Sequence, residues 1–280
     1  MKKRNMTIGF FARPDNIKAR LWEAKIRRFL AKKYSWVRIV EKKPRVLIVL
    51  GGDGTILEAA RKYQNGGPVI LGLNLGRVGF LASCRNPKKF LGSIDAVLKG
   101  KHRIAKRMML ASHVIRRGKT IFSASSLNDV AIQNPLGIVE LEVSIEGHAF
   151  QYVRGTGLLV STATGSTAYN LSAHGPIVMP DIKCFIITEL LDHNIPTPSI
   201  VVKRNREIVL KILDFRTRGL LSITKTGERA DVLLVSDSDL VCALKKGDTV
   251  IVSRSPRLVK FAEIEKGYFF KSLQEKFAFR

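Results

Sequence analysis

The chain has 280 residues, of which 45% are hydrophobic, so it can form one large domain or two smaller ones with a proper core. It contains no uninterrupted apolar run of about eighteen residues, which excludes a transmembrane helix from what we expect. The formal net charge of +25 predicts attraction to polyanions such as nucleic acid, an acidic membrane surface or a multiply phosphorylated ligand.

The basic start of the chain lacks the long apolar run and the cleavage site of a secretory signal, so we expect it to lead into a strand. A helical pattern follows over residues 15–33, with basic side chains mostly on one face. We expect its apolar stripe to consist of Ile17, Leu21, Ile26, Phe29 and Leu30. Because no aromatic-rich recognition motif accompanies the charge, we interpret the basic face as solvated and do not expect nucleic acid as a partner.

The first hundred residues alternate between strand and helix patterns. We predict strands at residues 7–11, 36–40, 45–50 and 69–74, and helices at 15–33, 54–63 and 87–98. Residues 45–50 form an almost continuous aliphatic run, which is typical of a strand buried on both faces. This alternation predicts a Rossmann-like parallel sheet covered by helices, in an α/β domain over residues 1–102.

From residue 103 onward, strands follow strands with turn signals between them. We predict strands at 109–116, 120–125, 130–133, 139–145, 158–162, 185–187, 200–202, 208–212, 220–225, 232–235, 241–243 and 250–254. This pattern predicts an all-β C-terminal domain over residues 103–255. The tail, residues 256–280, returns to helical spacing over 268–279, and we expect it to dock on one of the domains.

The three cysteines, Cys84, Cys184 and Cys242, are far apart and form no Cys-x-x-Cys pair. The sequence therefore predicts neither a zinc site nor a disulfide framework. We expect buried free thiols in a reducing cytoplasm, which is the compartment that we predict for the protein.

A loop with one carboxylate among three glycines follows the predicted strand 45–50. Its residues are Gly51, Gly52, Asp53, Gly54 and Thr55. A strand that ends in glycines and leads into a helix leaves N–H groups free at the helix N-terminus, and these attract phosphate. Asp53 is then expected to accept a proton from an attacking hydroxyl or to hold Mg²⁺ on the phosphates. A helix cap with glycines shaping the turn is the alternative.

A second glycine-rich segment, residues 74–81, follows the next predicted strand and contains Asn74 and Gly76. Two neighbouring parallel strands that end in such loops define a crevice at their carboxyl ends, where sheets of this kind bind ligands. Simple turn chemistry is the alternative.

Hydroxyl groups are concentrated in residues 158–176. They belong to Ser161, Thr162, Thr164, Ser166, Thr167, Tyr169 and Ser172. Gly165 permits a tight turn, and Gly175 with Pro176 ends the short helix that we expect after it. Hydroxyls at a helix start can bind sugar and base edges, and an aromatic ring can stack on a base, whereas helix capping accounts for only some of them.

Asn128 and Asp129 stand where the predicted strand 130–133 begins. Together they can bind both hydroxyls of a ribose, although Asn-Asp is also common turn chemistry. The five histidines show no metal-ligand spacing, and the chain contains neither Gly-x-Ser-x-Gly nor Gly-x-x-x-x-Gly-Lys-[Ser/Thr]. We therefore expect no metal site made by the protein alone, no hydrolase elbow and no Walker-type phosphate loop.

These segments resemble the NAD kinase family in their order and approximate spacing. The matching pieces are residues 51–55, 74–81, 128–129 and 157–176, and the stretch 244–248 is also similar. The Gly-Gly-Asp-Gly loop occurs in diacylglycerol and sphingosine kinases too and, with Ser next, in phosphofructokinases, but those families lack the segment 161–176 in this form.

The resemblance implies that the 2′-hydroxyl of the adenosine ribose of NAD is phosphorylated by ATP or polyphosphate, with a divalent cation such as Mg²⁺ carried on the phosphates. It implies an NAD kinase-like two-domain fold with the active site between the domains, in a homodimer or homotetramer. By position, Asp53 is the general base, Gly54 contacts phosphate, and Asn128 and Asp129 hold the dinucleotide. The other residues assigned to binding are Gly51, Gly52, Thr55, Asn74, Gly76, Arg154, Thr156, Thr164, Gly165, Thr167, Ala168, Tyr169, Asn170, Leu171, Ser172 and Asp239.

Several positions depart from the family pattern. They are Thr156 in place of a substrate-contacting Asp, Ala163 in place of Pro, Asp192 in place of the Pro before His193, and Asp239 in place of Gln. The phosphoryl-transfer residues therefore match the family better than those on the nicotinamide side. A preference for NADH, or a weakened enzyme, stays open on this evidence.

Two other functions also stay open. One is a lipid or sugar kinase that shares the glycine-aspartate loop, which would phosphorylate an acceptor other than NAD. The other is a binding protein without catalysis, which senses a dinucleotide or binds nucleic acid through its basic face.

Overall fold

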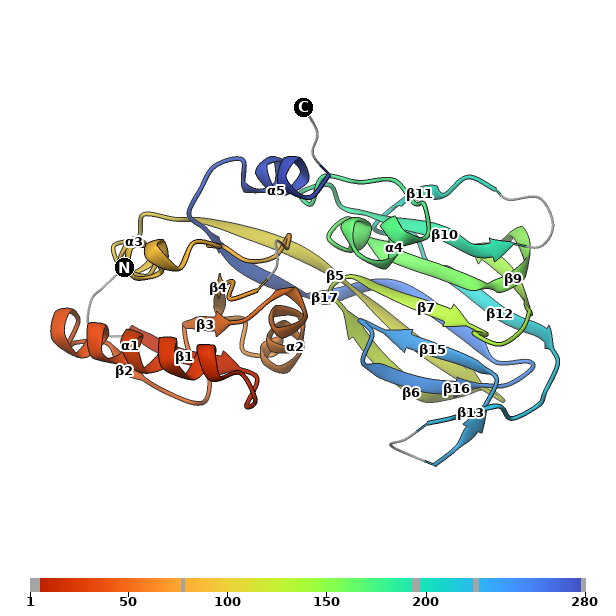
Figure 1. Ribbon diagram of the computed structural model, residues 1–280. Coiled ribbons are helices and arrows are strands. Elements are labelled where there is room, and N and C mark those ends of the chain that lie inside the picture. Colours follow the sequence, from red (N-terminus) through yellow and green to blue (C-terminus); the bar gives the residue numbers. More distant parts are fainter. Residues whose placement is uncertain (1–5, 77–78, 193–196, 224–226, 278–280) are drawn as a thin grey trace. The chain divides into compact units, whose positions relative to one another are not determined.

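The computed structural model describes residues 6–76, 79–192, 197–223 and 227–277 (Figure 1). The chain divides into two compact units. The first comprises Met1–Arg107 together with Arg257–Arg280, and the second comprises Met108–Pro256. Two long strands, β5 (Arg103–Arg116) and β17 (Thr249–Glu263), each begin in one unit and end in the other.

The first unit is built on a parallel sheet with the strand order β17-β4-β3-β1-β2. Its strands are β1 (Thr7–Ala12), β2 (Arg38–Ile39), β3 (Val46–Leu50), β4 (Val69–Leu73) and the end of β17. Its helices are α1 (Ile17–Lys33), α2 (Asp53–Tyr63), the 3₁₀ turn η2 (Pro87–Lys89), α3 (Phe90–Leu98) and α5 (Tyr268–Phe277). The predicted α/β fold with a parallel sheet is confirmed.

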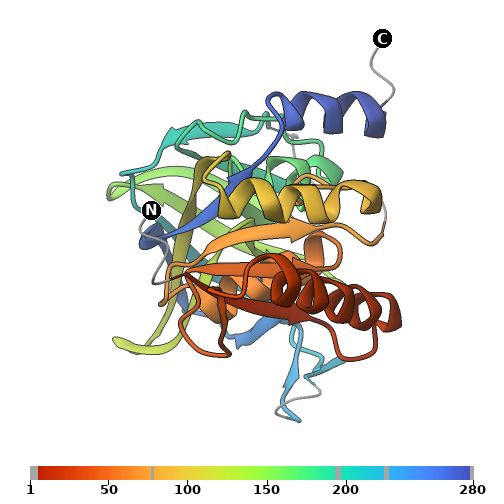
Figure 2. The same ribbon diagram turned by 90° about the vertical axis from the view of Figure 1, so that its left-hand side faces the viewer.

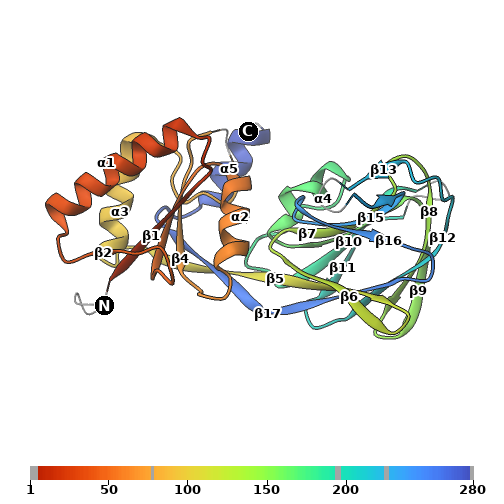
Figure 3. The same ribbon diagram turned by 90° about the horizontal axis from the view of Figure 1, so that it is seen from below.

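Helices cover both faces of this sheet, as the parallel topology requires. Helices α1 and α3 lie on one face of the sheet (Figures 2 and 3). Their buried residues Ile26 and Phe90 share one core cluster with Ile48 of β3. Helix α2 lies on the opposite face (Figure 3). There Gly72 of β4 admits its Ile56, since a Cβ on Gly72 would lie 2.8 Å from Ile56 Cδ1. The buried strand β3 therefore ends between two helix layers, directly before α2.

Helix α1 differs in one respect from the predicted amphipathic pattern. Ile17 and Leu21 are 72% and 67% exposed, and the face packed in the core carries Ala19, Ile26 and Leu30. Ile26 follows Ile17 by nine residues, which at 3.6 residues per turn places the two on opposite sides of the helix. The predicted stripe is therefore confirmed at Ile26, Phe29 and Leu30, which pack in the core, and is wrong at Ile17 and Leu21, which are exposed.

The second unit is mostly antiparallel β-structure, as predicted. Its strands besides β5 and β17 are β6 (Lys119–Ser126), β7 (Asp129–Gln133), β8 (Val139–Ile145), β9 (His148–Thr162), β10 (Cys184–Asp192), β11 (Ile200–Lys203), β12 (Ile208–Phe215), β13 (Leu221–Ser222), β14 (Arg229–Ala230), β15 (Val232–Ser236) and β16 (Leu240–Leu244). The main strand order is β16-β15-β7-β9-β8-β12-β17, and β10 pairs with β9 and β11. A 3₁₀ turn, η3 (Gly165–Thr167), and a short helix, α4 (Tyr169–Ser172), follow β9.

Strand β9 is much longer than the predicted strand 158–162. It pairs with β8 along its first half, and with β7 and β10 along its second half. Its first half mixes polar and exposed apolar residues such as Phe150 and Tyr152, and Gly155 and Gly157 interrupt it, so a continuous apolar pattern covers only its end. Gly157 is required by this packing, because its φ is +148° and a Cβ would lie 1.9 Å from Ile132 O.

Other predicted elements shorten or shift. The strand predicted at 36–40 is reduced to β2, and that predicted at 220–225 is reduced to β13, with residues 224–226 outside those described. The tail helix is confirmed as α5, while residues 278–280 lie outside the described part. Among the residues described, no helix combines the length and apolar character needed to cross a bilayer.

Candidate functional site

Asp53 lies at the carboxyl end of β3, in the first turn of α2, with Gly52 as the N-cap residue. Gly51 fills the tight junction between strand and helix, since a Cβ there would lie 2.5 Å from Thr55 Oγ1. An acidic side chain in the first turn of a helix is favoured by the helix dipole. The local sequence therefore places one carboxylate at the end of a buried strand, where parallel sheets bind ligands.

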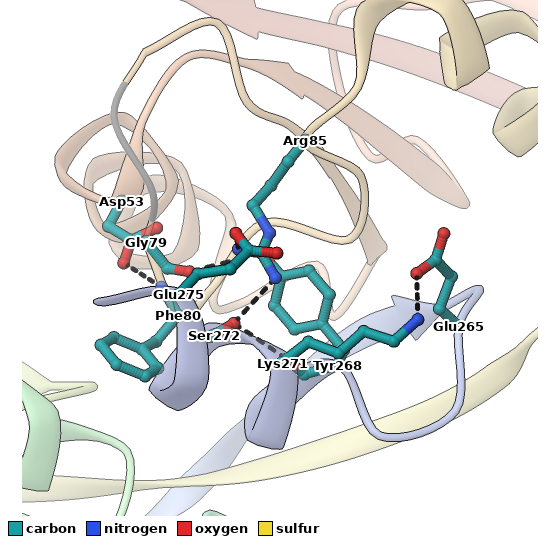
Figure 4. A network of polar contacts seen from close by, with 9 residues as sticks. All are labelled: Asp53, Gly79, Phe80, Arg85, Glu265, Tyr268, Lys271, Ser272 and Glu275. Carbon is teal, nitrogen blue, oxygen red and sulfur yellow. Dashed lines mark hydrogen bonds and ion pairs between the residues drawn. The ribbon is translucent and has the colours of Figure 1, made fainter. Parts of the chain in front are cut away.

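Backbone amides of the second glycine-rich segment bind the Asp53 carboxylate (Figure 4). Phe80 N donates to Oδ2 at 2.7 Å and Leu81 N donates to Oδ1 at 3.3 Å. The structure thus brings together the two glycine-rich loops, as their positions after neighbouring strands predicted. Asn74 is buried at the start of the second loop and its Oδ1 accepts from Gly76 N at 2.8 Å, whereas residues 77–78 lie outside those described.

The ionisation of Asp53 reflects opposing effects. Burial raises its pKa above the ordinary value, while the amides of Phe80 and Leu81 and the charges of Lys276 and Arg85 oppose that rise. A carboxylate that is buried but hydrogen-bonded is a stronger base than one in water, and it is held in a fixed plane. This arrangement can accept a proton from a substrate hydroxyl.

Gly79 is the position where the second loop approaches Asp53 most closely. A Cβ at Gly79 would lie 2.2 Å from Asp53 Oδ1. We therefore expect Gly79→Ala to displace the carboxylate and to lower turnover by about 100-fold, the usual consequence of a misplacement near 1 Å. Steady-state kinetics measures this, with Gly92→Ala as the control because a Cβ at Gly92 meets nothing within 4 Å. Full activity in Gly79→Ala would show that the close approach has no catalytic consequence.

In the second unit, Asn128 and Asp129 are held by a carboxylate that the sequence analysis did not single out. Asp237 accepts from the amides of Leu127 at 2.8 Å, Asn128 at 2.8 Å and Asp129 at 3.2 Å. Asp237 N donates in return to Asp129 O at 3.1 Å. Asp237 and Ser238 have positive φ values of 46° and 59°, in a turn without glycine. Such strain is maintained where the surrounding contacts require it.

We expect Asp237→Ala to cost at least about 3 kcal/mol of unfolding free energy, because it leaves three buried amides without their acceptor. Urea unfolding followed by circular dichroism measures the loss. Ser238→Gly is a matched control in the same turn, where relief of the positive φ should leave stability unchanged or improved. Equal stability of Asp237→Ala and the wild-type protein would contradict the bracing role of this carboxylate.

Asp129 is the most unusual titrating group of this unit. It is 5% exposed, and burial together with the neighbouring Asp237 charge raises its pKa to about 7. The negative charge of Asp129 also contributes to the raised pKa of Tyr169, after burial. The charge of Asp129 therefore acts on Tyr169, which lies forty residues later in the sequence.

Many of the hydroxyls in residues 158–176 bind within the protein. Thr162 Oγ1 donates to Leu127 O at 2.6 Å, and Ser166 Oγ donates to Ala163 O at 2.8 Å. Asn170 is fully buried, and both ends of its side-chain amide are hydrogen-bonded within the protein. Its Nδ2 donates to Pro176 O, and its Oδ1 accepts from Thr188 Oγ1. These groups build the turn, which accounts for more of the hydroxyl pattern than the sequence analysis allowed.

The remaining members of the predicted set divide by exposure. Thr164, Gly165 and Thr167 are buried in the turn, whereas Ala168 and Leu171 are half-buried, and Tyr169 and Ser172 are exposed. The exposed group is the one available to a ligand.

On β9, Arg154 pairs with Glu140 at 3.1 Å and lines a cavity of about 310 Å³ with Arg218. Thr156 Oγ1 donates to Leu190 O at 2.7 Å, so its hydroxyl is engaged by backbone. Asp239 lies exposed in the Asp237 turn, and His193, which follows Asp192, lies outside the described residues.

No group of three or more His, Cys, Asp or Glu side chains that could hold a metal ion occurs within the described ranges. Asp53 can contribute one oxygen ligand. This donor set fits Mg²⁺ bound mainly by the phosphates of a nucleotide, since Mg²⁺ commonly takes one or two carboxylates plus phosphate oxygens and water.

Sequence models of one family match both parts of the chain. The ATP-NAD kinase N-terminal domain matches residues 8–102, and the ATP-NAD kinase C-terminal domain matches residues 127–264. Among curated proteins, the NAD kinase of Lachnospira eligens is 31% identical over 246 residues, covering 87% of this chain and 83% of that protein. The NAD kinase of Geobacter metallireducens is 34% identical over 231 residues, covering 82% and 77%.

Two solved structures share the fold. A yeast NADH kinase complexed with NADH gives a TM-score of 0.86 at 18% identity, covering 98% of this chain and 88% of that one. An NAD kinase from Archaeoglobus fulgidus in complex with ATP gives a TM-score of 0.74 at 22% identity, covering 96% and 99%.

Proposed function

Because this chain belongs to the NAD kinase family, we propose that it is a phosphotransferase that transfers the γ-phosphoryl group of ATP to the 2′-hydroxyl of the adenosine ribose of NAD. The observation that carries the proposal is the Asp53 carboxylate, oriented by the amides of Phe80 and Leu81 at the end of β3. Inorganic polyphosphate is an alternative donor, because the phosphate contacts would be the same.

Asp53 serves as the general base in this proposal. It takes the proton of the 2′-hydroxyl as that oxygen attacks the γ-phosphorus and the bond to the β-phosphate oxygen breaks. Phosphoryl transfer has a loose transition state, so positioning and charge stabilisation supply most of the rate. A half-buried carboxylate with fixed orientation meets the first of these requirements.

The start of α2 binds the donor phosphates. Amide groups of the first helical turn, together with the helix dipole, favour anions, and a glycine at position 54 leaves room for them. Arg13 adds positive charge here, because its Nη2 lies 3.6 Å from the position that a Cβ on Gly54 would take. The Arg13 guanidinium also pairs with Glu58 at 3.4 Å. Mg²⁺ carried on the phosphates supplies further charge neutralisation.

The second unit holds NAD. Asn128 and Asp129 bind ribose hydroxyls other than the reacting 2′-hydroxyl, whose proton goes to Asp53, since an amide oxygen and a carboxylate can each accept a hydroxyl proton. Tyr169, which is exposed and on which the charge of Asp129 acts, is suited to stack on a ring of the dinucleotide. Ala168 and Ser172 belong to the same binding surface, Thr167 supports it from within the turn, and Arg154 is assigned to the phosphates.

Thr156 motivates a proposal on acceptor choice. The family pattern has a carboxylate at this position, whereas the Thr156 hydroxyl is engaged by Leu190 O. The group that the family carboxylate contacts on the substrate is then left without this partner. We propose that discrimination between NAD and NADH is altered, which a comparison of kcat/KM for the two acceptors measures.

One experiment tests the function directly. Purified protein is incubated with Mg-ATP and one acceptor in each of several parallel reactions. The acceptors are NAD, NADH, diacylglycerol, sphingosine and fructose 6-phosphate, and the phosphorylated product of each reaction is quantified. NADP or NADPH formation supports the proposal. A lipid or sugar phosphate without NADP would contradict it, and so would a protein that binds RNA at physiological salt and makes none of these products. Light scattering in the same buffer tests the proposed homo-oligomer.

A further inference from the structure

The C-terminal helix α5 lies beyond both family sequence models, the second of which ends at residue 264. We propose that α5 is a positioning element of catalysis, which fixes the backbone of Gly79, Phe80 and Leu81 so that the amides of Phe80 and Leu81 hold Asp53 in the orientation of a base. This inference rests on the proposed function, which assigns the base to Asp53.

The first step is the contact between α5 and the loop. The Tyr268 hydroxyl donates to Gly79 O at 3.4 Å. The Phe80 ring lies 5.7 Å from Phe269 and 6.4 Å from Phe277, between ring centroids, and is nearly parallel to the latter at 26°. With this packing Phe80 is only 9% exposed. The loop therefore takes its place against the helix through one main-chain bond and one enclosed aromatic ring.

The second step is the attachment of α5 to the rest of the unit. Arg85 Nη1 pairs with Glu275 Oε2 at 2.5 Å, and its Nη2 donates to Ser272 Oγ at 3.2 Å (Figure 4). The guanidinium also lies over the Tyr268 ring, 4.7 Å from the centroid. The Arg85 side chain is 17% exposed and that of Glu275 is 54% exposed, so Arg85 is held inside the unit while its carboxylate partner reaches it from the surface. A second ion pair at 3.2 Å joins Lys89 to Glu265.

The third step leads from the loop to the base. Phe80 N and Leu81 N bind different oxygens of Asp53, so a shift of the loop rotates or displaces the carboxylate. A displacement near 1 Å costs about 100-fold in rate for a group that must reach its proton at hydrogen-bond distance. Lys276 of α5 and Arg85 face Asp53 as positive charges and oppose the rise in its pKa that burial causes. Tyr268 also faces it, and Glu275 neutralises part of the Arg85 charge.

The test uses two neighbouring phenylalanines of the full-length protein. Phe269→Ala removes a ring that touches Phe80, whereas Phe270→Ala removes a ring that is 57% exposed and contacts Phe269 alone among the described aromatic pairs. We expect Phe269→Ala to lower kcat about 10–100-fold with an unchanged KM for NAD, because the residues assigned to NAD lie in the second unit. Phe269→Leu should recover most of the lost activity, and Phe270→Ala should leave kcat unchanged.

Amide hydrogen exchange gives a readout that does not depend on activity. Phe269→Ala should speed exchange at Phe80 and Leu81 and leave the strands β3 and β4 protected. Unchanged exchange at these two amides would contradict the role of α5 whatever the activity. Faster exchange with an unchanged kcat would show that α5 holds the loop without positioning the base. A wild-type protein that makes no NADP contradicts the proposed function instead.

Discussion

Asp53→Asn is expected to lower kcat for NADP formation by about 10²–10⁴-fold, which is the usual contribution of a positioned general base. The amide of Asn cannot take the proton of the 2′-hydroxyl, while its carbonyl still accepts from Phe80 N. The KM for NAD should change little, because the ribose contacts assigned here come from Asn128 and Asp129. Quantifying NADP over a range of NAD concentrations measures both parameters.

The stability of Asp53→Asn should move the other way. Burial raises the pKa of Asp53 in the folded state above its unfolded value. The contribution of Asp53 to stability is therefore fully present below the pKa that Asp53 has in the unfolded chain. It is lost as pH rises through the pKa that Asp53 has in the folded protein. At neutral pH the neutral Asn avoids this cost, so its unfolding midpoint should equal or exceed that of the wild-type protein. The exposed Asp15→Asn is the control for both measurements. An Asp53→Asn variant with wild-type turnover would remove Asp53 from the role of base.

Asp129→Asn is expected to raise the KM for NAD by about 10–100-fold, because a hydrogen bond to a charged acceptor contributes roughly 1.5–3 kcal/mol. The kcat at saturation should fall less. In the wild-type protein the pKa of Asp129 is about 7, so its carboxylate forms as pH rises through that value. The KM for NAD should accordingly decrease between acidic and mildly alkaline pH, and Asp129→Asn should lose this part of the pH dependence.

Asp237→Asn provides the control for this titration. It removes the negative charge that, after burial, raises the pKa of Asp129. The pH dependence of KM should then move to lower pH, because Asp129 ionises more readily without a neighbouring carboxylate. A pH dependence of KM that is identical in wild-type protein, Asp129→Asn and Asp237→Asn would assign it to another group.

Local patterns were enough to predict the fold class and the two glycine-rich loops. The aliphatic run that became β3 and the glycines after it fix Asp53 at a strand end, and this rule is independent of distant residues. The partners of Asp53 were not predictable in the same way. Phe80 and Leu81 bind it through backbone amides, which every residue type possesses, so side-chain identity carries no signal of the contact.

Asp237 illustrates a second limit of the sequence. Its residue type suits a turn, and its role depends on Asp129, whose main chain lies opposite it only after β15 and β7 pair. The hydroxyls of residues 158–176 show the converse. Thr162 and Ser166 looked suited to a sugar, but they bind carbonyl groups of the turn itself. Composition shows that hydroxyl groups are present in a segment. Whether they bind a ligand or carbonyl groups of the protein depends on the register in which the strands pair.

The division of the first unit has a consequence for biosynthesis. The chain leaves this unit along β5 and returns along β17, so the segment Arg257–Arg280 is translated only after the whole of the second unit. Strand β4 pairs with β17 through Val69 and Ile70, and α5 contacts Phe80 from the same late segment. A nascent chain that already carries Asp53 and its glycines thus has neither the sheet partner nor the helix that completes their surroundings. The surroundings of Asp53 are therefore complete only after the segment Arg257–Arg280 has been synthesised and has packed against the first unit.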